Sequence, residues 1–346
     1  MIREALSYLY VNAKVMAKEG KFISSHKWDD LWGCASPGEI LSLLEGTDYF
    51  PYFSEGALND SRELEKAVLE EYSHLGREIS RIIPKGAPQL QEFILRKWDV
   101  INLRTIMRGI HGDLGKELIM NSLVEGGEMD LSFFTRLLDV ESMDDFVALL
   151  EKTPYHSLSD VLAKYNETKN LYFLESTLDK IYWAYLWQSI LKAKGIKEFK
   201  DFVERCVEAQ NLKIILRAKS NNMTLEEINA FLIPECPLLK EILPVFDEEN
   251  ISELIPLLED TVYFEPLASV EQEYEKTGSV LFFEDMLDNL ITKKADEIRK
   301  KKPFGAGPLI GFLISKDMEV QKLLAIIRST GVNLDKETIR ESLMRK

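Results

Sequence analysis

Apolar residues recur at spacings of three and four along most of the chain, which is the periodicity of helices that bury one face. Alternating apolar and polar runs, which predict strands, are nearly absent. Three segments, roughly 89–110, 197–220 and 308–330, carry apolar positions around well over half of a helical circumference and end close to Gly or Asn residues. The pattern therefore predicts an all-α protein in which three helices each pack on more than one side.

These three segments share one motif: an acid, Asn or Lys three residues later, and then Leu, Ile and Arg. Its copies are Asp99, Asn102, Leu103, Ile106, Arg108; Glu208, Asn211, Leu212, Ile215, Arg217; and Glu319, Lys322, Leu323, Ile326, Arg328. A weaker copy opens the chain, at Asn12, Ala13, Met16 and Lys18. Because Asn is unfavourable inside helices, Asn102 and Asn211 are expected to make buried hydrogen bonds that fix helix packing.

Two further motifs accompany these helices. Leu-Leu-Glu-x-Thr-x-Tyr occurs three times, at 43–49, 149–155 and 257–263, and Phe-x-Glu-x-x-Leu-Asp occurs twice, at 173–179 and 282–288. Their common order and spacing predict three similar helical bundles, since a period of about 110 residues is too long for the units of a solenoid, which is the structural alternative. The expected boundaries are 1–85 plus 307–346 for a terminal bundle, 86–195 for a second and 196–306 for a third.

The terminal bundle is expected to combine both ends of the chain. The C-terminal copy stops at Leu343-Met344 without the Leu-Leu-Glu continuation, whereas the N-terminal region carries that continuation without a full helix copy before it. An incomplete unit would expose apolar surface, which costs about 25 cal/mol of free energy per Å².

The repeated arginines are expected to serve the fold because an unpaired charge beside apolar positions is costly. The candidate partners of these arginines are the helical acids Glu175, Glu284 and Glu65, which recur with a similar period.

Charge and composition narrow the classes of partner. The chain has 346 residues, 43 basic and 58 acidic, and a net charge of −15, which disfavours nucleic acid. Its three cysteines lie far apart and predict no disulfide framework. The most apolar stretch, residues 181–191, is shorter than the ~20 residues of a membrane span, so any membrane association is expected to be peripheral.

No pattern for catalysis is present. The four histidines are scattered without metal-ligand spacing, and neither a phosphate-binding loop nor a nucleophile elbow occurs. Gly305–Gly311 has the wrong spacing for a dinucleotide loop and is better explained as the start of a helix, with Pro308 in its first turn. We therefore expect no catalytic residue, no cofactor and no metal.

Two clusters allow more than one interpretation. A basic group either interacts with a helix C-terminus and solvent or forms a docking patch for an acidic partner or lipid headgroups; it consists of Lys293, Lys294, Arg299, Lys300, Lys301 and Lys302. An aromatic group is typical of a core or bundle interface rather than of a ligand platform; it consists of Tyr182, Trp183, Tyr185 and Trp187.

The segments 102–108, 211–219 and 311–319 resemble the repeated helices of the C subunit of A-type and V-type rotary ATPases, called d in the eukaryotic relatives. Lys322 departs from the Asn of the other copies, so no role of Asn transfers there. The resemblance implies three bundles around a pseudo-threefold axis, forming a funnel. It also implies a non-catalytic rotor adaptor that couples the central stalk to the membrane proteolipid ring for proton or sodium transport. Such a subunit would lie on the cytoplasmic face, in one copy per complex. The alternative is an all-helical scaffold or tethering protein unrelated to rotary ATPases.

Overall fold

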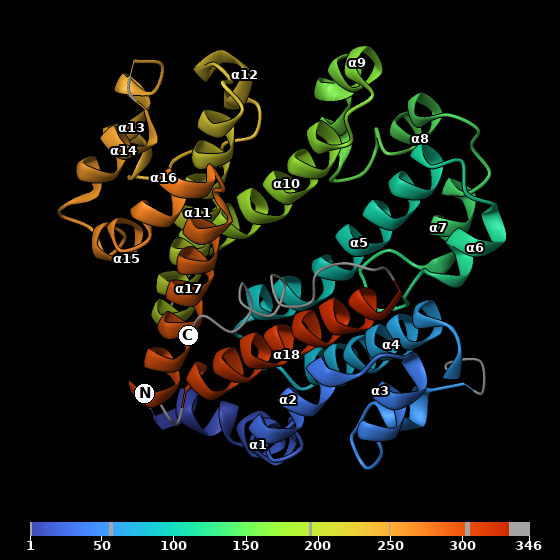
Figure 1. Cartoon of the computed structure of the whole chain (residues 1–346). Helices are drawn as coiled ribbons and strands as arrows, with labels where there is room; N and C mark the ends of the chain where they lie inside the picture. Colours follow the sequence, from blue (N-terminus) through green and yellow to red (C-terminus); the bar gives the residue numbers. More distant parts are fainter. Residues whose placement is uncertain (1, 55–57, 194–195, 249, 302–304, 332–346) are drawn as a thin grey trace. The chain divides into compact units, whose positions relative to one another are not determined.

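The computed structural model describes residues 2–54, 58–193, 196–248, 250–301 and 305–331. The regular secondary structure of these residues is helical throughout, which confirms the all-α prediction (Figure 1). The helices are α1 (Ile2–Glu19), α2 (Ser25–Gly33), α3 (Pro37–Leu43), α4 (Ser61–Ser80), α5 (Pro88–His111), α6 (Lys116–Asn121), α7 (Leu131–Leu137), α8 (Met143–Leu149), α9 (Ser159–Thr168), α10 (Tyr172–Leu191), α11 (Lys197–Ser220), α12 (Leu225–Asn229), α13 (Leu239–Ile242), α14 (Ile251–Leu254), α15 (Phe264–Ala268), α16 (Glu271–Thr277), α17 (Leu281–Lys301) and α18 (Gly307–Gly331). Short 3₁₀ turns are η1 (Phe50–Tyr52), η3 (His156–Leu158), η4 (Leu243–Val245) and η5 (Ile255–Leu258).

The three motif helices are α5, α11 and α18, and their ends lie within one residue of the predicted ones. Pro88 stands in the first turn of α5, where its missing N–H leaves no hydrogen bond unmade. Gly307 and Pro308 likewise open α18, so Gly305–Gly311 leads into a helix as predicted. Gly112 and Asn221 cap the ends of α5 and α11. Local signals therefore determine where these helices begin and end.

The chain divides into two compact units. The terminal unit holds the described residues of Met1–Phe146 and of Glu297–Met344, and the internal unit holds those of Val147–Asp296. The boundaries fall inside α8 and α17.

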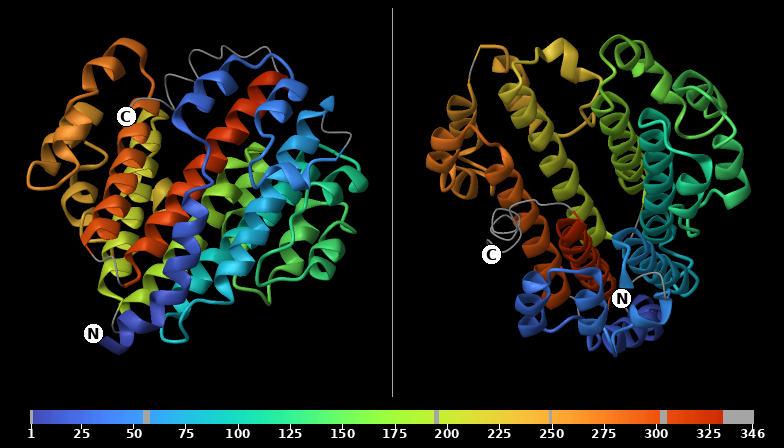
Figure 2. Two further views of the ribbon diagram at one scale, coloured as in Figure 1. Left: turned by 90° about the horizontal axis from the view of Figure 1, so that it is seen from below. Right: turned by 45° about the vertical axis from the view of Figure 1, so that its right-hand side comes forward.

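In the terminal unit, α18 packs against α4 and α1, so the last described helix is surrounded by the first ones (Figure 2). One hydrophobic core joins Leu31, Ile40 and Leu44 from the N-terminal region to Leu323 and Ile327 of α18. Phe22 stacks on Phe312, with ring centroids 5.5 Å apart. Residues from both ends of the chain thus share one core.

In the internal unit, α10 packs against α11 and α9. Two of its aromatic residues, Tyr182 and Trp187, are buried, and two, Trp183 and Tyr185, are half-buried, consistent with packing between helices. Tyr182 and Trp183 meet edge to face at 5.0 Å. The aromatic group on α10 therefore contributes mainly to packing.

The described helices offer nothing that is both long and apolar enough to cross a bilayer. The side chains of all four histidines are exposed, as expected for surface positions; they are His26, His74, His111 and His156. Among the described residues, no group of three or more His, Cys, Asp and Glu side chains is arranged to hold a metal ion.

Candidate functional site

The repeated asparagines each tie a motif helix to a loop 22 residues further along the chain. Asn102 Nδ2 donates to the carbonyl of Val124 at 2.7 Å, and its Oδ1 accepts from the Val124 N–H at 2.9 Å. Asn211 makes the same pair of bonds with Ile233, at 3.0 and 2.8 Å. Both asparagines are fully buried, so each satisfies two backbone groups that would otherwise lose water without compensation. The predicted buried hydrogen bonds are confirmed at both positions.

The Leu-Leu-Glu-x-Thr-x-Tyr motif forms the same turn in all three copies. The threonine hydroxyl donates to the carbonyl of the second leucine at 2.6–2.7 Å in Thr47, Thr153 and Thr261. The second leucine and the tyrosine are buried in every copy. This geometry explains why Leu, Thr and Tyr recur, because the turn inserts a tyrosine ring into the core.

In the internal unit, that tyrosine reaches the repeated acid of α11. Tyr263 donates to Glu208 at 2.7 Å, and Arg205, one turn earlier, lies 3.5 Å from the same carboxylate. The Arg205 guanidinium also lies 4.9 Å from the centre of the Tyr263 ring. Burial raises the pKa of Glu208, and burial also raises the pKa of Tyr263 far above its usual range. The result is a compact cluster of cation, acid and tyrosine.

The terminal unit contains an equivalent cluster that is assembled from the two ends of the chain. Tyr49 donates to Glu319 at 2.7 Å, and the Ile23 N–H donates to the other oxygen of that carboxylate at 2.7 Å. Lys316, one turn before Glu319, lies 3.1 Å from both Glu319 and Glu71. Its ammonium also lies 4.1 Å from the centre of the Tyr49 ring. Burial raises the pKa of Glu71 and of Tyr49.

The third repeated acid, Asp99, holds a loop. Its carboxylate accepts from the N–H groups of Glu128 and Met129 at 3.2 and 3.0 Å. A Cβ at Gly127 would lie 1.8 Å from the carboxylate, so only glycine allows the loop to approach this closely. Burial raises the pKa of Asp99 to about 7, although the two N–H donors oppose the shift.

The repeat also includes a basic residue three positions before each acid, and this residue lies outside the five motif positions. These residues are Arg96, Arg205 and Lys316. Arg205 and Lys316 face the acid and the tyrosine, whereas Arg96 pairs with Glu128 at 3.0 Å. The signal is present in the sequence as a constant spacing of three residues, but only the contacts reveal its purpose.

Two of the repeated arginines lie in ion pairs with acids from the candidate set. Arg217 binds Glu284 through two parallel contacts, at 2.5 and 2.6 Å. Arg328 contacts one oxygen of Glu65 at 2.9 Å. Arg108 belongs to the terminal unit and the third candidate acid, Glu175, to the internal unit, so a partner for Arg108 among these acids stays a prediction.

The basic group on α17 divides into different environments. Lys293 and Lys300 are exposed and Lys294 is half-buried. Arg299 reaches Glu19 at 3.3 Å, and its aliphatic stem fills the space above Gly311. Lys301 ends α17, and Lys302 lies outside the described residues. Arg299 thus has a packing role, while docking by the other members stays a prediction.

A cavity of about 320 Å³ lies in the internal unit between α9 and α10. Lys180 in its wall donates to the Ala230 carbonyl at 2.7 Å, and burial lowers the pKa of this amine. The remaining lining is mostly apolar and includes Val161, Ile181 and Tyr185. Ser157, Asp160 and Thr177 are further polar residues of this lining.

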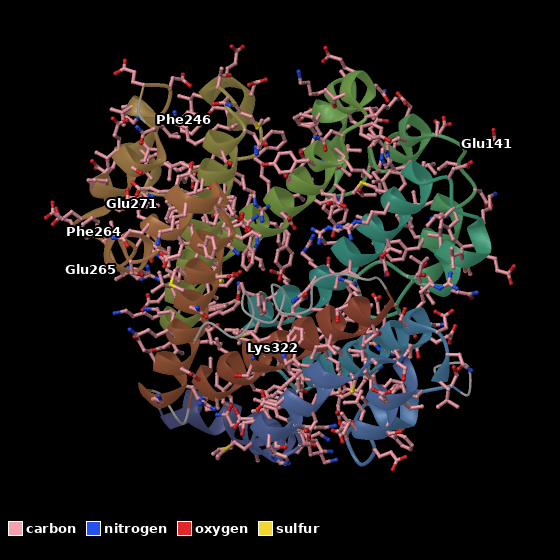
Figure 3. All side chains as sticks on the ribbon, viewed as in Figure 1. Glu141, Phe246, Phe264, Glu265, Glu271 and Lys322 are labelled. Atoms are coloured by element: carbon pink, nitrogen blue, oxygen red, sulfur yellow. The ribbon has the colours of Figure 1, made fainter. Side chains whose placement is uncertain are left out.

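Negative charge is concentrated in one segment of the internal unit. Residues 221–280 contain 14 acids and two bases, a net charge of −12 out of −15 for the whole chain. The segment spans α12 to α16, and Figure 3 marks two of its acids, Glu265 and Glu271, beside α15 and α16. Such a surface attracts a cationic partner and repels phosphate.

Similar proteins support one family. The chain resembles a protein from Methanocaldococcus jannaschii described as the C subunit of an A-type ATP synthase, with 32% identity over 351 residues, covering 99% of this chain and 88% of that protein. A protein of the same description from Methanosphaera stadtmanae is 30% identical, with 99% and 89% covered, and one from Haloferax volcanii is 24% identical, with 97% of both covered. Residues 11–342 match the family of the ATP synthase (C/AC39) subunit. This match includes all three motif helices and both end-to-end contacts of the terminal cluster, and the chain therefore belongs to the ATP synthase (C/AC39) subunit family.

Proposed function

We propose that this chain is the non-catalytic rotor adaptor of an A-type rotary ATPase, joining the central stalk to the membrane proteolipid ring. The observation that carries the proposal is the family match over residues 11–342, together with relatives described as the C subunit of A-type ATP synthases. Membership of this family removes the alternative of a scaffold unrelated to rotary ATPases.

The repeat supports an adaptor in physical terms. Three bundles of similar construction around a pseudo-threefold axis would form a funnel with a central opening for the stalk. The proposed bundles are 1–85 plus 307–346, 86–195 and 196–306. Torque transfer requires a body that does not deform, and the buried clusters around Glu208 and Glu319 attach α11 and α18 to distant segments. One copy per complex, on the cytoplasmic face, suits a part that lies on the axis of rotation.

The acidic segment 221–280 supports docking of a basic stalk tip. Complementary charge speeds association and orients the partner, and its effect weakens as salt rises. The proposal therefore includes a stalk contact that loses affinity when ionic strength increases. The ion that the complex transports is a proton or sodium.

A purified assembly tests this function. Tagged chain is expected to retain both stalk subunits and proteolipid ring from detergent-solubilised membranes, and a complex lacking the chain should hydrolyse ATP without moving ions. The isolated chain should show no ATPase activity, because it has no phosphate-binding loop. Turnover by the isolated chain, or failure to retain either the ring or the stalk, would contradict the proposal.

A further inference from the structure

The first helix carries an unusual solvent-facing side. Leu9, Tyr10 and Met16 of α1 are 49%, 68% and 62% exposed, and Ala13 and Ala17 between them are exposed as well. At about 100° per residue, these five positions fall within an arc of roughly 120°. The opposite side, with Tyr8, Val11 and Val15, is buried in the terminal unit. A helix that is apolar on both sides is normally covered on both sides.

The exposed arc contains no charge, and the charged residues at its edges already have partners. Lys14 pairs with Glu78 at 2.5 Å and Lys18 with Asp48 at 3.1 Å. Glu19 pairs with Arg299 at 3.3 Å. An uncharged apolar centre with a satisfied polar rim is the construction of a protein interface.

Equivalent positions of the full motif helices are buried, whereas those of α1 are exposed. α1 is the weaker copy of the motif helix, with Asn12 at the position of Asn102 and Asn211. In each full copy, the residues one and four positions after the Asn or Lys of the motif are buried. They are Leu103, Ile106, Leu212, Ile215, Leu323 and Ile326. In α1 the same positions are Ala13 and Met16, and both are exposed. The face that the other copies bury within the chain is therefore open in α1.

Asn12 itself reflects the same incompleteness. Its Nδ2 donates to the Gly305 carbonyl at 3.0 Å, but its buried Oδ1 accepts no hydrogen bond from any described residue. Asn102 and Asn211 use both atoms to hold the following loop of their own copy. No such loop of the chain takes up this role at α1 in the described residues.

We propose that the outer face of α1, defined by Leu9, Tyr10, Ala13, Met16 and Ala17, binds the proteolipid ring, and this assignment rests on the proposed function. An uncharged apolar face gains nothing from a basic stalk tip, for which segment 221–280 is the complementary surface. A ring of membrane helices presents helix ends and short loops where it leaves the bilayer. Ala13 and Ala17, one turn apart, allow a partner backbone to approach closely between the larger side chains.

Lipid and a second copy of the chain are the competing occupants, and the geometry favours neither. Lys14 and Lys18 are held by acids, so their ammonium groups are not available for anionic headgroups. A dimer through α1 would place two copies on a rotor axis that accommodates one. The ring is the occupant favoured by an uncharged apolar face whose flanking lysines are already paired.

Binding of the full-length chain to purified ring in detergent tests the assignment. Met16→Glu and Leu9→Glu are expected to weaken ring binding by about tenfold or more, because each puts a charge in the apolar centre of an interface. Leu114→Glu is the matched control, since Leu114 is also 49% exposed in the terminal unit but lies outside α1, and it should bind the ring as the unmodified chain does. Circular dichroism and melting temperature should be unchanged in all three variants.

The outcomes separate this inference from the function on which it rests. If the unmodified chain binds the ring and both α1 variants bind equally well, the assignment of α1 is overturned and the adaptor function stands. If the unmodified chain does not bind the ring, the adaptor function falls with it. Flotation with phosphatidylglycerol vesicles, or concentration-dependent dimers that Met16→Glu abolishes, would replace the ring by lipid or by a second copy and so overturn the assignment.

Discussion

The clusters around Glu208 and Glu319 each combine a cation, an acid and a tyrosine, but the terminal cluster adds Glu71 and is assembled from more distant segments. In the internal unit, Tyr263 lies 55 residues after its acid, whereas in the terminal unit Tyr49 lies 270 residues before its acid. Lys316 and Glu319 are almost fully buried, while the side chains of Arg205 and Glu208 retain 18% exposure. The terminal cluster therefore does two tasks: it fixes a motif helix, and it joins the ends of the chain. We expect it to be the more fragile of the two.

Deleting residues 307–346 should cause the largest difference in stability between the two units. The deletion removes α18, whose buried side chains include Leu309, Ile310, Phe312, Val320, Leu323 and Ile327. Burial of each side chain contributes about 1.5–3 kcal/mol, so their sum is similar to the free energy of unfolding of a typical domain, about 5–15 kcal/mol. Amides of α1 and α4 should lose protection from hydrogen exchange, while those of α10 and α11 keep it. The truncated chain should also fail to join stalk to ring, and unchanged protection in α4 would contradict the shared core.

Much of this architecture follows from local sequence, and some of it does not. The ends of α5, α11 and α18 were predictable because Pro88, Pro308 and Asn221 act on their own helix. The buried asparagines were also predictable, since a polar amide inside an apolar helix needs a partner. The contact from Tyr49 to Glu319 was not, because periodicity describes which face of a helix is buried and never what covers it.

Two other features could be recognised only from contacts. Asp99 has the same place in the motif as Glu208, but it binds backbone N–H groups of a loop, a difference that depends on the close approach at Gly127. The exposed side of α1 is equally invisible to pattern analysis, since its apolar residues have the spacing of a buried face. Sequence patterns therefore predicted the elements, their internal signals and the candidate acids that pair with Arg217 and Arg328, whereas the contacts of Tyr49 and Asp99 are known only from the structure.

Replacing the cation of each cluster should show the next largest difference. Lys316→Met leaves Glu71 and Glu319 buried without a cation, and loss of one partner of a buried ion pair costs about 3–5 kcal/mol. Arg205→Met is the matched change in the internal unit. Glu208 keeps its bond from Tyr263 and some contact with water, so a loss of about 1 kcal/mol is expected. Urea unfolding of both variants measures the two values, and equal losses would contradict the greater fragility of the terminal cluster.

The third acid extends the comparison to pH. The folded pKa of Asp99 is about 7 against an ordinary value of 3.8, so the folded state binds the proton more tightly. Stability then falls as pH rises from about 4 to 7 and levels off above the folded pKa. Between pH 5 and 8 this group alone should lower the free energy of unfolding by about 2–3 kcal/mol.

Asp99→Asn tests that sign directly. The amide resembles the protonated acid, so the variant should lack this part of the pH dependence. Its free energy of unfolding should rise relative to that of the unmodified chain as pH rises from 5 to 8. The equivalent Glu208→Gln should change the slope less, because an arginine and a tyrosine face its carboxylate. Chemical unfolding at several pH values measures both slopes. If Asp99→Asn and the unmodified chain run in parallel from pH 5 to 8, Asp99 does not titrate in this range.

The smallest expected effect concerns the arginines at the ends of the motif helices. Arg217 binds both oxygens of Glu284, whereas Arg328 contacts a single oxygen of Glu65, and both guanidinium groups are more than a third exposed. Solvent screening limits such pairs to roughly 0.2–1 kcal/mol. A lysine keeps the charge but loses the planar guanidinium that contacts both carboxylate oxygens. Arg217→Lys should therefore cost about 0.5–1 kcal/mol and Arg328→Lys less than about 0.5 kcal/mol.

Double-mutant cycles with Glu284→Gln and Glu65→Gln separate the pair energies from other effects of each change. A coupling energy at Arg328 equal to or above that at Arg217 would show that the two-point geometry adds nothing, and that the repeated arginines act through charge alone.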